Sequence, residues 1–191
     1  MGKMADVMRQ LESMAPTLLL SMPQLDDPNF HHSVVLLCQY SDEGAWGVVI
    51  NRPTGKAASM VVQLDPPLTH DSGIELWVGG PVEPERGCIL IAEELPDAES
   101  VRVSDGLYLS GSPALLRRLL ESETPPKCRL LMGYAGWGPG QLEAELTQSA
   151  WLIADVDLDL VFDTDPKEMW EKAIRRLGAD PGNLQMSPGV H

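Results

Sequence analysis

The stretch GYAGWGPGQLEAEL, residues 133–146, is the most informative part of this chain. It follows an apolar run ending at Leu131 and Met132, places four glycines within eight residues, and then enters a short helix pattern. Glycine adopts backbone conformations that other residues avoid, so this density predicts a loop whose path only glycine permits. A helix N-terminus directly after it presents unpaired N–H groups. The stretch therefore predicts either a binding loop or a tightly folded structural corner.

Size and charge limit the classes of protein that the chain can represent. Its 191 residues suit one domain or one domain with a tail, and 43% apolar residues suffice for a core. The 28 acidic and 14 basic residues give a net charge of −14, which disfavours nucleic acid and anionic membranes as direct partners. No apolar run reaches the ~18 residues of a membrane span, and the N-terminus lacks a secretory signal pattern. We expect a soluble cytoplasmic protein.

Three cysteines, Cys38, Cys88 and Cys128, are widely spaced and lie in apolar, strand-like runs. No C-x-x-C pair is present, so neither a zinc ribbon nor a thioredoxin-type motif is indicated. We expect reduced, buried, core-filling thiols. Cys128, between Lys127 and Arg129, is the candidate for a reactive thiol.

Alternating and continuous apolar patterns predict about eight strands with three or four helices. A helix is predicted after Ser112-Pro113, and another after Asp165, with Pro166 at its first position and Gly178 beyond its end. The order shows no regular β-α-β alternation, which indicates an α+β domain with a strongly curved, mixed and mostly antiparallel sheet. The predicted strands are 17–23, 33–40, 45–51, 74–80, 88–94, 101–103, 107–109, 128–133 and one or two within 151–163, and the other predicted helices are 4–14, 57–64 and 139–149.

Four segments together resemble the YqgE/AlgH family of bacterial proteins. They are LLLSMPQLDDPNFHHSVVLLCQYSDEGAWGVVINRP (18–53), VGGPVEPERGCIL (78–90), GYAGWGPGQLEAELTQSAWL (133–152) and MWEKAIRRLGADP (169–181). The resemblance covers a domain over residues 16–191, after a variable helical extension over 1–15. His31-His32 depart from the family pattern, which more often has Arg or Lys there, and Ile91 stands where a His is usual.

The resemblance implies a compact α+β fold on a curved, partial-barrel-like sheet with helices outside it, in a bacterial cytoplasm. Members are often labelled transcriptional regulators through an association with alginate synthesis. This sequence has no helix-turn-helix, zinc finger or basic stripe to support direct DNA contact. Its local basic clusters, Arg117-Arg118 and Arg175-Arg176, have acidic neighbours and are typical of solvated helix faces. We interpret the label as an indirect association.

We predict one candidate binding face, formed by the motifs that the predicted strands and helices do not explain. Trp137, between two glycines, either plugs an end of the sheet or anchors a partner. Arg52 either binds a carboxylate or phosphate or pins a loop, and the Gly79-Gly80 pair permits a sharp turn or a close approach by another backbone or a ligand. The candidate ligand- or partner-binding residues are Asn51, Arg52, Gly79, Gly80, Gly136, Trp137, Gln141 and Glu145.

Neither a metal centre nor a catalytic constellation is predicted. His31 and His32 are adjacent, and on a strand they would point to opposite faces and not share one metal. No G-x-S-x-G, H-E-x-x-H, phosphate-loop or dinucleotide motif is present, so we expect no cofactor. The leading hypothesis is a non-enzymatic binding or regulatory protein with an unidentified protein or small-molecule partner. An enzyme, hydrolytic in type, on the same face is the alternative, and direct DNA binding is third.

Overall fold

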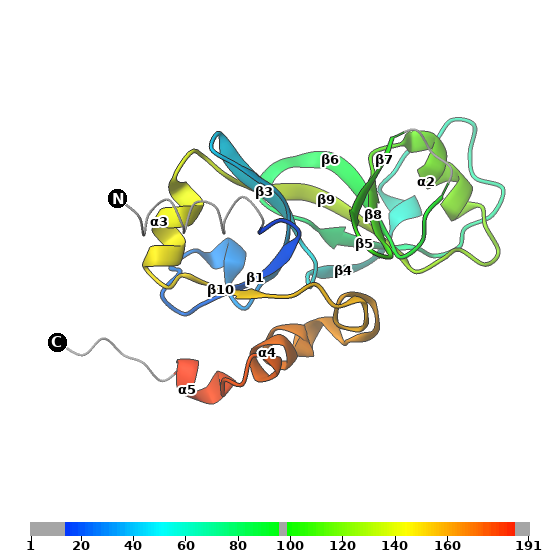
Figure 1. Cartoon of the computed structure of the whole chain (residues 1–191). Coiled ribbons are helices and arrows are strands. Elements are labelled where there is room, and N and C mark those ends of the chain that lie inside the picture. Colours follow the sequence, from blue (N-terminus) through cyan, green and yellow to red (C-terminus); the bar gives the residue numbers. More distant parts are fainter. Residues whose placement is uncertain (1–13, 96–98, 186–191) are drawn as a thin grey trace. The chain divides into compact units, whose positions relative to one another are not determined.

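The structure, a computed structural model, describes residues 14–95 and 99–185, which form two compact units (Figure 1). The first unit combines the chain up to Asn51 with the chain from Ala135 onward, and the second runs from Arg52 to Tyr134. The helix predicted over 4–14 lies almost wholly outside the described residues. No helix within the described ranges is long and apolar enough to cross a membrane.

The sheet of the first unit is antiparallel and has the strand order β10-β1-β2-β3, followed by the end of β9. Its central strand β1 is buried at all five residues, because apolar side chains face packed layers on both sides. Leu18 lies opposite Leu36 of β2 and Ala154 of β10. The strands are β1 (Thr17–Ser21), β2 (Val34–Ser41), β3 (Gly44–Val49), β9 (Cys128–Trp137) and β10 (Trp151–Ala154).

The helices of the first unit follow capping signals that the sequence carries. The Asp165 side chain accepts a hydrogen bond from Lys167 N at 2.9 Å, Pro166 opens α4, and Gly178 beyond its end has φ +80°. Buried Trp170 lies on the inner face of this helix. The helices are η1 (Pro28–Phe30, 3-10), α3 (Gln141–Thr147), η3 (Asp159–Asp163, π), α4 (Pro166–Arg176) and α5 (Pro181–Gln185).

The second unit contains β7-β8-β6, then residues 128–134 of β9, then β5 and β4. Only the β5–β9 pair among the described strands is parallel. A register shift between Val82 and Gly87 interrupts the β6–β9 pairing, and β6 bends along its length (Figure 1). The elements are β4 (Pro53–Ala57), η2 (Ala58–Met60, 3-10), β5 (Glu75–Val78), β6 (Val82–Ile91), β7 (Ser100–Ser104), β8 (Leu107–Ser110) and α2 (Pro113–Leu120).

The α+β class with a curved, mixed and mostly antiparallel sheet is thus confirmed. Three local predictions were wrong. Residues 133–137 form a strand rather than a loop, because Gly133, Ala135 and Trp137 are buried in alternation with more exposed neighbours. The helix predicted over 57–64 reduces to the 3-10 turn η2, which is preceded by strand β4.

The third wrong prediction concerns the alternating segment after β10. Instead of a strand, residues 159–163 form a π-helix, although the apolar and polar residues alternate. The Asp157 side chain accepts from Leu160 N at 3.0 Å, and Thr164 Oγ1 donates to Asp159 O at 3.1 Å. These local side-chain bonds satisfy backbone groups that a strand would need a neighbour to satisfy.

Candidate functional site

The glycine-rich stretch folds into a corner whose polar centre is the Glu145 carboxylate. Its Oε2 accepts from Trp137 Nε1 at 2.9 Å and from Trp151 Nε1 at 2.7 Å. Its Oε1 accepts from Gln141 Nε2 at 3.0 Å. A carboxylate between two buried indoles satisfies donors that would otherwise be orphaned in the core.

The aromatic residues of this corner belong to the core of the first unit. Trp137 is 6% exposed and packs edge-to-face on Trp151, with ring centroids 5.8 Å apart. Exposed Gly136 pairs with Trp46 of β3, and Gly140 caps α3 with φ +73°. The geometry therefore accounts for the corner through packing, and a binding role for Gly136, Trp137, Gln141 and Glu145 stays a prediction.

The Gly79-Gly80 pair lies where two backbones approach closely within the second unit. A Cβ at Gly79 would stand 2.4 Å from Gly133 O, and a Cβ at Gly133 would stand 2.3 Å from Gly80 O. Gly79 N also donates to Met132 O at 2.7 Å. Another backbone thus occupies the space that the glycines leave.

Asn51 and Arg52 make hydrogen bonds at the ends of strands. The Asn51 amide accepts from Val34 N and donates to His32 O, each at 2.9 Å. The carbonyl of half-buried Arg52 accepts from Val78 N at 2.9 Å, and burial lowers the pKa of its guanidinium.

Within the first unit, Asn51 does not join the glycine corner. It lies beyond the end of β3, whereas Trp137 pairs with Ala45 near the start of that strand. Six residues of extended chain separate these points by about 20 Å. The other three candidates, Arg52, Gly79 and Gly80, belong to the second unit.

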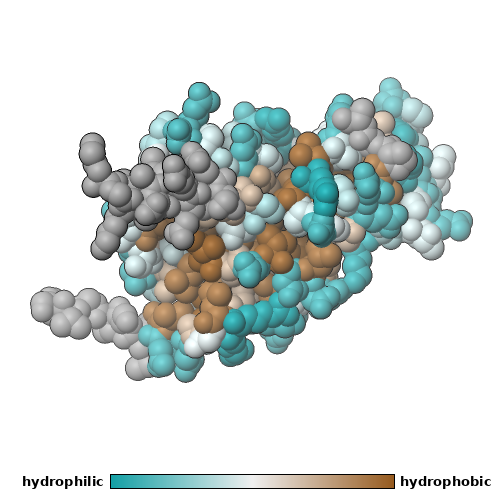
Figure 2. Space-filling view, in the orientation of Figure 1, coloured by the Kyte–Doolittle hydropathy of each residue, from teal (hydrophilic) through white to brown (hydrophobic). Residues whose placement is uncertain are grey.

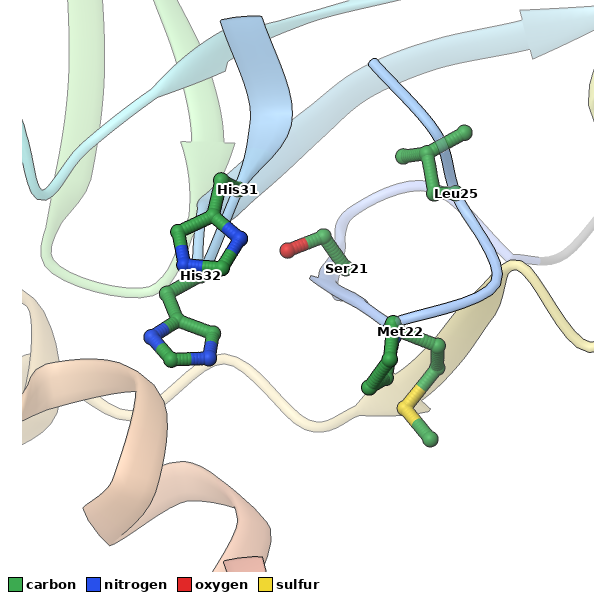
Figure 3. Close-up of a pocket in the computed structure, with 6 residues that line it drawn as sticks. Ser21, Met22, Leu25, His31 and His32 are labelled. Carbon is green, nitrogen blue, oxygen red and sulfur yellow. The ribbon is translucent and has the colours of Figure 1, made fainter. Parts of the chain in front are cut away.

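A pocket of about 300 Å³ opens in the first unit where β1 ends and β2 begins (Figure 3). The chain leaves β1 at Ser21, passes through η1, and returns through a short turn into β2. The lining residues are Ser21, Met22, Pro23, Leu25, His31 and His32.

Three rings form a stack at this pocket. The imidazoles of His31 and His32 have centroids 4.1 Å apart at 21°, and His32 lies 4.3 Å from the Trp170 ring at 17°. Trp170 Nε1 in turn donates to Ser21 O at 2.8 Å. His32 has φ +49°, a left-handed conformation that is uncommon outside glycine. The stack and the Asn51 hydrogen bond to its carbonyl hold it there.

The two histidines are therefore on a turn, and the expectation that they face opposite ways was wrong. Stacked rings hold their nitrogen lone pairs in nearly parallel planes that do not converge on one ion, which suits a shared metal poorly. Within residues 14–95 and 99–185, no group of three His, Cys, Asp or Glu side chains is placed to hold a metal.

Two buried hydroxyls lie at or beside the pocket. Ser21 is 2% exposed, and its Oγ accepts from Ser33 N at 2.8 Å, while its own proton has no acceptor among the described residues. Figure 3 shows this hydroxyl pointing toward the side of the pocket where His31 lies. The Oγ of fully buried Ser33 has no hydrogen-bond partner in the described part of the chain. Such groups in a native fold call for an explanation.

The thiols and basic clusters do not add a site. All three cysteines are free and half-buried rather than fully buried. Burial raises the pKa of Cys88 and of Cys128 to about 11, which disfavours the thiolate that a reactive cysteine requires. Arg117, Arg175 and Arg176 pair with Glu121, Glu171 and Asp157 at 3.2, 2.9 and 2.6 Å.

Apolar side chains are exposed on the first unit around β10. Figure 2 shows adjoining brown atoms over the part of the view where β10 lies. Ile153 is 42% exposed, Leu158 36% and Leu177 44%. Leu177 follows the last turn of α4, where the helix no longer covers it.

The fold is that of an α+β protein, and its first unit carries a small pocket lined in part by the His31-His32 turn. Residues 18–182 match the family described as AlgH-like, and the chain belongs to that family. The resemblance found in the sequence is thereby confirmed.

Relatives and solved structures match over most of their length. A UPF0301 protein of Ruegeria pomeroyi is 37% identical over 90% of this chain and 96% of the relative. A UPF0301 protein of Myxococcus xanthus is also 37% identical, over 95% of this chain and 100% of the relative. The solution structure of the AlgH protein from Pseudomonas aeruginosa has a TM-score of 0.72 at 34% identity and covers 92% of this chain and 94% of that one. A Corynebacterium diphtheriae crystal structure, at TM-score 0.64 and 22% identity, shares the fold.

Proposed function

We propose that this chain is a non-enzymatic binding protein with a regulatory role in the cytoplasm, and that the pocket at Ser21 and His32 holds its small ligand. The observation that carries this proposal is that contacts within the chain hold His32 in position at the pocket. Its ring stacks on buried Trp170, and its carbonyl accepts from Asn51. A site that is already organised loses less conformational freedom when the ligand binds.

The size and lining of the pocket support a small ligand. A volume of about 300 Å³ is at the lower end of ligand sites, which combine apolar walls with a few placed polar groups. Met22 and Leu25 supply apolar wall, while Ser21 and the two imidazoles supply polar groups. The glycine corner is the weaker candidate because its polar side chains already bond one another.

A hydrolytic enzyme is the second candidate, favoured by the Ser21 hydroxyl that points toward the side where His31 lies (Figure 3). A serine nucleophile needs a base that accepts its proton and a third group that orients the base. Among the described residues, no hydrogen bond joins Ser21 to an imidazole and no carboxylate lines the pocket. Direct DNA binding ranks third, given the charge of −14 and the paired arginines.

A thermal-shift screen of the full chain tests the binding proposal. Wild type, His31→Ala and His70→Ala are compared against nucleotides, metabolites and divalent metals, with Arg52→Ala probing the other predicted site. We expect a compound that raises Tm with concentration in wild type and His70→Ala but not in His31→Ala. A hit lost only in Arg52→Ala, or no hit at all, would contradict the proposed pocket.

A fluorophosphonate probe separates binding from hydrolysis. The oxygen of an activated serine attacks the phosphorus of the probe and displaces fluoride, and intact-mass and peptide analysis locate the phosphonylated residue. We expect no adduct at Ser21. Labelling of Ser21 that disappears in Ser21→Ala would replace the binding protein with a hydrolase.

A further inference from the structure

The pocket is an exception to the acidity of the chain. The chain has 28 acidic residues, yet none of the described residues that line the pocket is acidic. Its ionisable lining groups are the two histidines. A negatively charged ligand therefore meets no carboxylate on these walls, whereas the net charge would repel it over much of the rest of the surface.

Each polar side chain that lines the pocket can donate a hydrogen bond into it. The Ser21 hydroxyl accepts from Ser33 N and still has its proton to donate. Imidazole donates through one ring nitrogen when neutral and through both when protonated. Because the two rings are stacked within 21° of parallel, their N–H groups lie in nearly parallel planes, with the ring centroids 4.1 Å apart. Figure 3 shows a nitrogen of each ring on the side that faces Ser21 and Met22.

We propose that this pocket binds a compact oxyanion, a carboxylate or phosphate group, between the Ser21 hydroxyl and the imidazole edges. The inference rests on the proposed function and names its ligand class. The oxygens of the anion accept the Ser21 proton and imidazole N–H bonds, and charged acceptors make the stronger hydrogen bonds. A short apolar remainder of the ligand packs on Met22 and Leu25. A ligand without an acceptor would leave the buried Ser21 proton unpaired.

Three small probes test the oxyanion inference at one fixed pH. Isovalerate offers a carboxylate on a branched apolar group, isovaleramide has nearly the same shape without the charge, and inorganic phosphate offers the other oxyanion. Binding is followed by the imidazole NMR signals of His31 and His32, with His70, an exposed histidine of the second unit, as the internal control.

We expect saturable shifts of the His31 and His32 signals with isovalerate or phosphate, and affinity at least tenfold weaker for isovaleramide. Preference between the two anions identifies the carboxylate or the phosphate as the group recognised. Ser21→Ala should weaken anion binding about tenfold, the effect of one charge-assisted hydrogen bond. That variant should fold, because Ser33 N also donates to Phe30 O at 3.1 Å. His31→Ala removes an exposed ring and serves as the second variant.

Other outcomes separate the two proposals. Equal affinity for isovalerate and isovaleramide, or anion binding unchanged in both variants, would overturn the oxyanion inference. If a neutral compound from the thermal screen shifts the His31 and His32 signals while neither anion does, the oxyanion inference falls and the binding function stands. If neither anion nor any screened compound moves these signals, both fall.

Discussion

The glycine corner and the histidine pocket lie in the same unit and differ in how completely their polar groups are used. At the corner, the Glu145 carboxylate accepts from Trp137, Trp151 and Gln141. At the pocket, the Ser21 hydroxyl keeps a proton without an acceptor in the described residues. The glycine-rich sequence of the corner is explained by its constrained backbone and its packing. The ligand proposed for the pocket would instead use the Ser21 proton.

The largest expected effect follows from removing the indole at the corner. Trp137→Ala should lower the free energy of unfolding by about 3–5 kcal/mol, because it empties a buried aromatic site. Urea unfolding followed by circular dichroism measures this. Trp46→Ala, at a half-buried tryptophan of the same unit, should cost clearly less. A change below ~1 kcal/mol at Trp137 would make the corner a surface feature and reopen it as a site.

Removing the carboxylate that accepts from both indoles should have the second-largest effect on the free energy of unfolding. Glu145→Ala leaves two Nε1–H donors without their carboxylate and should cost about 2–3 kcal/mol by the same urea measurement. Glu168→Ala, at an exposed position of α4, is the control and should change stability by less than ~0.5 kcal/mol. Equal effects of the two substitutions would show that the corner does not depend on this carboxylate.

A smaller effect is expected at the residue that holds the histidine turn. Asn51→Ala removes hydrogen bonds to Val34 N and His32 O and should cost about 1–2 kcal/mol. It should also shift the His32 NMR signals and weaken ligand binding, because His32 loses its anchor. Asn29→Ala, at an exposed residue whose side-chain amide donates to Asp27 Oδ1 at 3.0 Å, should do neither. Unchanged His32 signals in Asn51→Ala would show that the stack alone positions the ring.

The smallest stability effect is expected in the pocket itself. His31 is exposed, so His31→Ala should change the free energy of unfolding by less than ~0.5 kcal/mol while abolishing the thermal shift given by ligand. The pair of results, stability kept and binding lost, is the reverse of that expected for Trp137→Ala. A loss of several kcal/mol would assign His31 to the structure of the turn instead.

The sequence predicts elements whose signals are local. The β1–β3 region follows from continuous apolar runs, and α4 follows from Asp165, Pro166 and Gly178. The continuation of β9 through Trp137 was missed because its glycines outweighed an alternation of buried and exposed positions. The π-helix was missed because Asp157 and Thr164 bond backbone groups that no propensity scale considers.

The candidate site is harder to predict because it depends on contacts between distant positions. His31-His32 stand out in the sequence, but their shared stack depends on Trp170, more than a hundred residues later. Ser21 carries no local signal at all. Its buried hydroxyl, whose proton has no acceptor among residues 14–95 and 99–185, takes this position only once the β1–β2 connection is folded.

The interruption of the first unit has a consequence for synthesis on the ribosome. Thr17 Oγ1 donates a hydrogen bond to Ala154 O, 137 positions later in the chain. Strand β1 therefore cannot pair with β10 until the whole second unit has been synthesised. At about 5–20 residues per second, this interval is on the order of ten seconds. The run Leu18–Leu20, completely buried in the folded protein, can pair with β2 but lacks its β10 neighbour during that time. We therefore expect nascent chains to engage a holding chaperone at this N-terminal run, and the second unit to become protease-resistant first.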